Sequence, residues 1–161
     1  MPSTYKPMSK DTTGGTVSTH SVPPRALFAV QLLKWWQTNK RDFPWRKTKD
    51  PYKILIAELL LRKTTAKQVE ALYEKFLSKY PDPKTLSEAS ETELEDVIRP
   101  LGIERRRATL LKAVSCEIVQ KHSAMIPTSK EELLELPGVG PYVANAVLCF
   151  SHGKDVPMVD T

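Results

Sequence analysis

Apolar residues recur at helical spacing along most of this chain, and no segment alternates between apolar and polar positions as a strand would. The spacing predicts helices over residues 25–39, 52–62, 66–79, 104–121 and 141–152, and two shorter helices that end at Arg99 and Leu136. Ser90 with Glu93 and Thr128 with Glu131 form capping-box patterns at the starts of the two short helices. We therefore expect an all-α fold built from many short helices.

Composition divides the chain into a tail and one domain. Residues 1–23 are mostly Ser, Thr, Gly, Pro and Lys without apolar periodicity, which indicates a flexible tail. The remaining residues, 24–161, are about one domain long, with no internal repeat. The longest apolar run, residues 54–61, is interrupted by Glu58 and is far shorter than the roughly 18 residues of a membrane span. We expect neither a membrane span nor a signal peptide.

Charge and cysteine content indicate which partners the protein binds and in which cellular compartment it works. The chain has 24 Lys and Arg against 19 Asp and Glu, a net charge of +5 and a pI near 9.2, which favours polyanionic partners. Cys116 and Cys149 both fall within helical apolar patterns, which is typical of buried thiols in a reducing compartment. An intracellular location, in the cytoplasm, nucleoid or nucleus, is the resulting expectation.

The most specific pattern is a glycine hairpin between two predicted helices, residues 136–140, with the sequence Leu-Pro-Gly-Val-Gly. Amide groups at the start of the following helix lack an intrahelical acceptor, and with the helix dipole they form a small anion site. Gly138, Val139 and Gly140 would let a phosphate oxygen approach the backbone closely. An ordinary turn between helices remains the alternative, since Pro-Gly pairs are common turn formers.

With this hairpin the chain resembles the helix-hairpin-helix DNA glycosylases of the endonuclease III superfamily, from about Phe43 to Asp160. The matching segments are Phe43-Pro44-Trp45-Arg46, Pro51-Tyr52-Lys53, residues 57–65, Leu101-Gly102-Ile103, the hairpin within residues 129–152, and Val159-Asp160. The resemblance implies a multi-helix glycosylase domain that acts, as a monomer, on double-stranded DNA containing a mismatched or damaged base. Within the superfamily, the Pro-Trp-Arg segment and Glu58 resemble the branch that removes mismatched bases.

The resemblance also assigns catalytic roles. Bifunctional members use a lysine nucleophile two positions after the second hairpin glycine, where this chain has Tyr142. A phenol cannot form the imine that an amine forms with the sugar, so a hydrolytic glycosylase is expected. Asp160 matches the catalytic aspartate of the family, whose carboxylate would stabilise an oxocarbenium-like sugar and activate water. For an isolated Asp, a helix cap or a solvated loop acid would be the ordinary interpretation.

Other candidate contacts lie before the hairpin. Glu58, surrounded by Ile and Leu, matches the base-pocket glutamate of the mismatch branch; a surface-facing Glu or a structural ion pair remains open. Arg62 and Lys63 lie where the family inserts a polar wedge after base flipping, although a charged pair at a helix end is often only solvated. Trp45 and Arg46 are further DNA-contact candidates. Three arginines at 105–107 are a candidate phosphate contact.

A few positions indicate which mismatched base would be removed. Tyr142, the run of residues 61–65 and Met158-Val159-Asp160 resemble the thymine-type enzymes, so thymine or uracil opposite guanine is the expected substrate. Adenine glycosylases, which act opposite 8-oxoguanine, usually have Ser and a Gln pair at the corresponding positions and are the alternative. A non-catalytic DNA-binding hairpin module is the second alternative.

The chain departs from the family at its C-terminal end. Family members continue past the catalytic Asp and usually carry a 4Fe-4S cluster on four clustered cysteines. Two separated cysteines cannot form that site, so we expect no metal or other cofactor on this chain. We expect the chain to be a C-terminally truncated piece of such a domain, which would be inactive if its missing part is required.

Overall fold

The structure, a computed structural model, describes residues 24–158. The predicted tail, residues 1–23, and Asp160 lie outside the described residues. The chain divides into two units, Met1–Arg41 and Asp42–Thr161. The domain expected over residues 24–161 is thus spread over both units, and each unit is described by itself.

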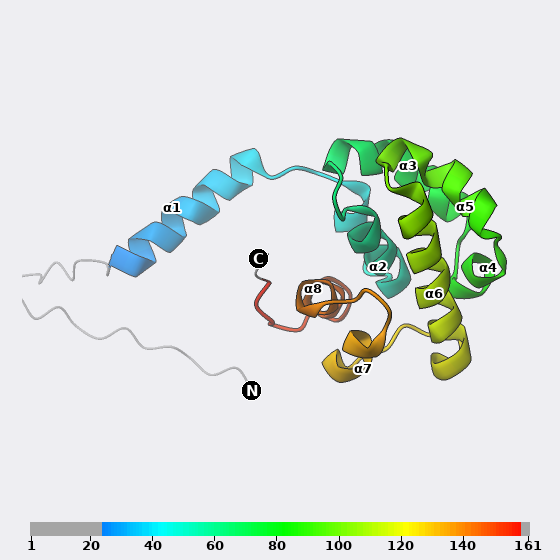
Figure 1. Ribbon diagram of the computed structural model, residues 1–161. Helices are drawn as coiled ribbons and strands as arrows, with labels where there is room; N and C mark the ends of the chain where they lie inside the picture. Colours follow the sequence, from blue (N-terminus) through cyan, green and yellow to red (C-terminus); the bar gives the residue numbers. More distant parts are fainter. Residues whose placement is uncertain (1–23, 159–161) are drawn as a thin grey trace, which may run out of the picture. The chain divides into compact units, whose positions relative to one another are not determined.

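The described residues form α-helices and two short 3-10 helices, and no strand occurs among them (Figure 1). The all-α prediction is therefore confirmed. The elements in chain order are α1 (Pro24–Asn39), η1 (Pro44–Arg46), α2 (Pro51–Leu60), α3 (Ala66–Lys79), α4 (Pro83–Glu88), α5 (Glu91–Ile98), η2 (Arg99–Leu101), α6 (Glu104–His122), α7 (Lys130–Glu135) and α8 (Pro141–His152).

The described part of the first unit, residues 24–41, contains the single helix α1, which begins at a proline, a favourable residue for a first helical turn. Its large apolar side chains are at least half exposed in this unit: Leu27, Phe28, Val30, Leu32, Leu33, Trp35 and Trp36. The helix itself agrees with the prediction for residues 25–39.

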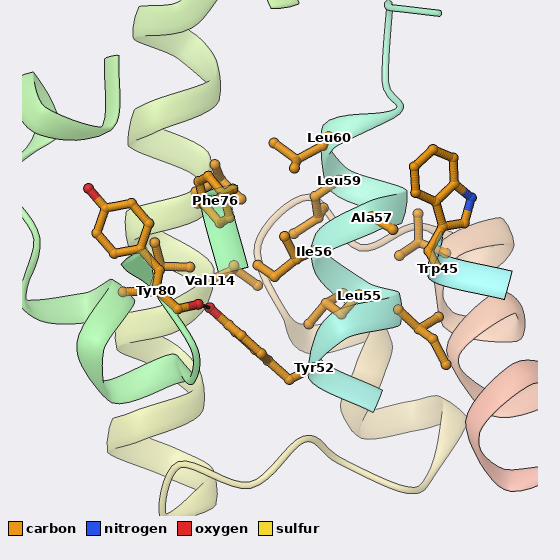
Figure 2. Close-up of a cluster of buried hydrophobic side chains, with 14 of the residues drawn as sticks. Trp45, Tyr52, Leu55, Ile56, Ala57, Leu59, Leu60, Phe76, Tyr80 and Val114 are labelled. Atoms are coloured by element: carbon orange, nitrogen blue, oxygen red, sulfur yellow. Dashed lines mark hydrogen bonds between the residues drawn. The ribbon is translucent and has the colours of Figure 1, made fainter. Parts of the chain in front are cut away.

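The second unit is built around α2, which is buried along almost its whole length. Its side chains contact aromatic residues of neighbouring elements in one apolar cluster (Figure 2). The hydroxyl of Tyr52 donates to the carbonyl of Tyr80 (2.9 Å), which satisfies a polar group inside this cluster. Helix α6 packs against α2, α4 and α5, and α8 packs against α2 and α7. Helix α2 therefore connects the α3–α6 group to the α7–α8 pair.

Caps explain most of the helix starts. Thr65 with Gln68 and Ser90 with Glu93 form complete capping boxes at α3 and α5. The cap of α7 differs from the prediction, because the Ser129 side chain, not that of Thr128, accepts from the Glu132 amide (3.2 Å).

Helix α4 and the cysteine environment also differ from expectation. The sequence pattern did not predict α4, a six-residue helix that Asp82 caps, because so short a helix shows no periodicity.

Cys116 and Cys149 are free and only half-buried, so the expectation of buried thiols is wrong.

Candidate functional site

The C-terminal end of α2 and the glycine hairpin, far apart in sequence, meet in the structure. Nη1 of Arg62 donates a hydrogen bond to the carbonyl of Gly138 at 3.1 Å, across 76 positions of sequence. The neighbouring helices α2 and α8 pack against each other. The structure therefore brings together two of the elements that the sequence singled out, the turn between α2 and α3 (residues 61–65, called the α2–α3 turn) and the hairpin.

The two hairpin glycines have different reasons to be glycine. Gly138 has φ +71°, and a Cβ there would lie 2.5 Å from Cδ1 of Leu110 and 3.0 Å from Nη1 of Arg62. Gly140 has φ −92°, and a Cβ there would meet no atom within 4 Å. Gly138 is needed by the fold, whereas the space beside Gly140 is open to a ligand.

The hairpin leads directly into α8. Gly140 is the N-cap of this helix and supplies no side-chain hydrogen bond to it, and Pro141 occupies the first turn. An amino end without a side-chain cap retains the partial positive charge that attracts anions. The Val139 side chain is buried, and its amide donates to the carbonyl of Leu136 (3.0 Å), which closes the turn of the hairpin. Tyr142, in the first turn of α8, is half-buried against the core.

Glu58 lies on α2 and is only 8% exposed. It is one of four polar or charged residues buried in the described part of the chain, with Arg107, Ser115 and Asn145. A surface-facing position is therefore excluded for this carboxylate, and a base-pocket role or a structural role remains.

Trp45 and Arg46 are neighbours in the chain, but Trp45 is buried and Arg46 is exposed. Trp45 is 5% exposed, stacks on Phe43 (ring centroids 4.8 Å apart) and meets the edge of Tyr73 (5.4 Å). Its ring belongs to the core, which corrects the prediction of a DNA contact (Figure 2). Arg46 is exposed, with its guanidinium 5.6 Å from the ring centroid of Phe150.

The three arginines at the start of α6 also differ. Arg105 and Arg106 are exposed, so both can reach a phosphate. Arg107 is 3% exposed, and burial, followed by the charge of Arg62, lowers the pKa of its guanidinium. Of the three arginines given as a candidate phosphate contact, Arg107 is therefore excluded by its burial.

The segment that leads toward Asp160 is attached to α8. The Asn145 side chain donates to the carbonyl of Pro157 (2.6 Å), while its oxygen is buried without a hydrogen-bond partner. Asp160 itself lies outside the described residues. The described part of the segment ends two residues before it, at Met158.

The sequence arguments missed Ile103 as a candidate contact. It is 52% exposed, and it has φ +47° although β-branched residues rarely adopt a left-handed conformation. Nε2 of Gln68 donates to the carbonyl of Pro100 (3.4 Å), so the loop before Ile103 adjoins the start of α3. The Leu-Gly-Ile run was a sequence signal, but only its exposure singles out Ile103.

The residues present do not fit an iron–sulfur cluster. The two cysteines lie on different helices, α6 and α8, and a 4Fe-4S site needs four thiolates. In the part of the chain that the structure describes, no three His, Cys, Asp or Glu side chains form a group able to hold a metal ion. Among residues 24–158, none of the helices combines the length and apolarity required to cross a membrane.

Comparison with known proteins agrees with this arrangement. Residues 56–161 match the model of the HhH-GPD superfamily base excision DNA repair proteins. A thymine-DNA glycosylase of Aeropyrum pernix is 48% identical over 131 residues, which cover 81% of this chain and 59% of that protein. An adenine DNA glycosylase of Mycobacterium tuberculosis is 37% identical over 139 residues, 86% of this chain and 45% of that protein.

The solved structure of a thermostable thymine-DNA glycosylase is similar to this chain with a TM-score of 0.81 at 40% identity. The match covers 84% of this chain and 63% of that one. The chain therefore spans less than two thirds of the length of these relatives.

Proposed function

Because the chain belongs to the HhH-GPD superfamily of base excision DNA repair proteins, we propose that it belongs to a monofunctional DNA glycosylase that removes a mismatched base from double-stranded DNA. The observation that carries the proposal is the junction of the α2–α3 turn with the hairpin, through the hydrogen bond from Arg62 to Gly138. The junction presents exposed cations beside a helix amino end that no side chain caps. Such an arrangement suits the sugar–phosphate backbone of a duplex.

In this proposal the hairpin backbone and the amino end of α8 bind phosphate, and Arg105 and Arg106 at the start of α6 add positive charge to the DNA-binding surface. Arg46 adds charge beside Phe150, near the other end of α8. These contacts position the protein without reading sequence. A stacked base must leave the helix before its glycosidic bond can be reached. Lys63 and Ile103 are the exposed residues with left-handed backbones on adjoining loops, and both suit the space that an extruded base leaves.

The chemistry proposed is hydrolysis at C1′ of the deoxyribose. The bond from C1′ to the base breaks with its electron pair on the base, and water adds to C1′ and gives up a proton. Asp160 is assigned the stabilisation of the positive sugar and the acceptance of that proton. Glu58 is assigned a contact with the extruded base. Tyr142 occupies the position of the lyase lysine, so no imine forms and the product is an intact abasic strand.

Thymine or uracil opposite guanine is the proposed substrate. The thymine-DNA glycosylase named above has the higher identity of the two relatives. Tyr142, in place of the serine usual in adenine glycosylases, supports the same choice. A monomer in the cytoplasm, nucleoid or nucleus completes the proposal.

Single-turnover base release on three duplexes tests this proposal. The complete gene product is mixed with duplexes carrying T:G, U:G or A:8-oxoguanine, and strands are resolved with and without alkali. We expect release from T:G and U:G, nicking only after alkali, and no covalent adduct with borohydride. Preference for A:8-oxoguanine would establish the adenine activity instead, efficient trapping would refute the hydrolytic mechanism, and duplex binding without release would indicate a non-catalytic module.

A further inference from the structure

Arg107, the buried arginine of α6, binds the backbone carbonyls at the C-terminal end of α2. Nη1 of Arg107 donates to the carbonyls of Leu59 (3.0 Å) and Leu60 (2.8 Å), and its Nη2 donates to the carbonyl of Arg62 (2.9 Å). The last carbonyls of a helix have no intrahelical donor, and a cation at that end also complements the helix dipole. One guanidinium thus fixes the backbone on both sides of the point where α2 becomes the turn.

Arg62 extends the same connection to the hairpin. Its backbone accepts from Arg107, while its own guanidinium donates to the carbonyl of Gly138. That guanidinium occupies the space beside the glycine, since a Cβ at Gly138 would lie 3.0 Å from Nη1 of Arg62. Four carbonyl acceptors therefore hold two cations close together, from α6 through the turn to the hairpin.

Lys63 is the residue that this connection leaves exposed. Its φ of +56° is a left-handed conformation that is unfavourable for a residue with a Cβ. Such a conformation persists only where the surrounding structure determines it. Hydrogen bonds from Arg107 and to Gly138 fix the residue directly before Lys63, and the Thr65 capping box fixes the start of α3 after it.

We propose that Arg107 and Arg62 are positioning residues that join the α2–α3 turn to the hairpin, so that Lys63 and the phosphate site move as one rigid unit. The effect of this rigid unit on DNA rests on the proposed function. Extruding a base requires energy to break base stacking, and a flexible turn would change its own conformation before it displaced the base. Arg62 then acts through Lys63 and the hairpin, and not by entering the DNA itself.

The coupling is tested first without DNA, by amide hydrogen exchange in the full chain. Arg62→Ala should raise exchange about tenfold both in the α2–α3 turn and at residues 138–140, because it removes a charge-assisted hydrogen bond that both share. Arg105→Ala removes the same charge from an exposed position of α6 and should leave exchange in both segments unchanged. Hairpin exchange equal to wild type in Arg62→Ala would overturn the proposal.

Base extrusion provides the second readout, from 2-aminopurine fluorescence beside a T:G mismatch. Arg62→Ala and Lys63→Ala should each reduce the extrusion signal at saturating protein, and the double variant should lose no more than Lys63→Ala alone. Additive losses would show that Arg62 contacts DNA independently and would overturn the positioning role.

Arg107 is tested by a graded pair of substitutions. Arg107→Lys keeps the charge but cannot reach three carbonyls with a planar fork, so its exchange and extrusion should fall between wild type and Arg107→Met. Identical behaviour of Arg107→Lys and wild type in both readouts would overturn the role of the fork. If Arg107→Met does not fold, Arg107→Lys and Arg62→Ala still decide. Failure of wild type to bind duplex DNA would refute the proposed function alone, because the exchange readout needs no DNA.

Discussion

Replacing Gly138 by alanine should destabilise the second unit, whereas the same change at Gly140 should not. At φ +71° an alanine pays roughly 1–2 kcal/mol for the left-handed backbone. The added methyl group would also lie 2.5 Å from Cδ1 of Leu110, and such overpacking costs typically 1–3 kcal/mol. Leu110 is half-buried and can rotate part of this contact away, so the total should be about 2–3 kcal/mol.

Urea denaturation followed by circular dichroism measures the difference. With a urea slope of roughly 2 kcal/mol per molar, Gly138→Ala should lower the midpoint by about 1 M. Gly140→Ala, with ordinary φ and no atom within 4 Å of the new methyl group, should stay within about 0.5 kcal/mol of wild type. Equal midpoints for the two variants would refute the assignment of Gly138 to packing and Gly140 to ligand approach.

Three further substitutions address DNA and chemistry. Gly140→Val should leave the urea midpoint unchanged and weaken duplex affinity about tenfold or more in fluorescence anisotropy, since its side chain fills the space proposed for phosphate. Glu58→Gln should reduce single-turnover base release more than duplex affinity, and equal release rates would remove Glu58 from the reaction. Asp160→Asn, in the complete gene product, should cut base release by ~10²-fold or more while mismatch binding persists; full activity would refute its catalytic assignment.

The long helices were predictable because their sequence signals agree with one another. Helix α3 was expected over residues 66–79 and has those bounds, since a threonine cap, an apolar stripe and a polar face all coincide. Helix α8 likewise starts at a proline and ends before Gly153, which has φ +64°. In α7 the capping pattern occurs twice in overlapping registers, from Thr128 and from Ser129, and the pattern alone could not choose between them.

The site was less predictable because burial depends on residues distant in sequence. A tryptophan beside an arginine, as at Trp45, is typical of a nucleic-acid contact. The Trp45 ring is nevertheless part of the core, where it packs against Tyr73, 28 positions later in the chain. Successive helix residues point about 100° apart, so three arginines in a row must face different directions. Which of the three arginines faces inward depends on where the end of α2 lies. The sequence of α6 alone does not indicate that position.

The net charge of +5 therefore overstates the electrostatic contact with DNA. The buried Arg107 guanidinium binds three carbonyls of the protein, so it is not available to replace a counterion on a phosphate. Arg62 is exposed, but the positioning role proposed above assigns its guanidinium to the carbonyl of Gly138 and not to a phosphate. Each phosphate neutralised by a protein cation contributes about 0.9 to the slope of log affinity against log salt. Arg105→Ala should therefore reduce that slope by about 0.9 in a salt titration, whereas Arg62→Ala should lower affinity with its slope unchanged. A slope that falls equally in both variants would mean that Arg62 leaves Gly138 for a phosphate when DNA binds.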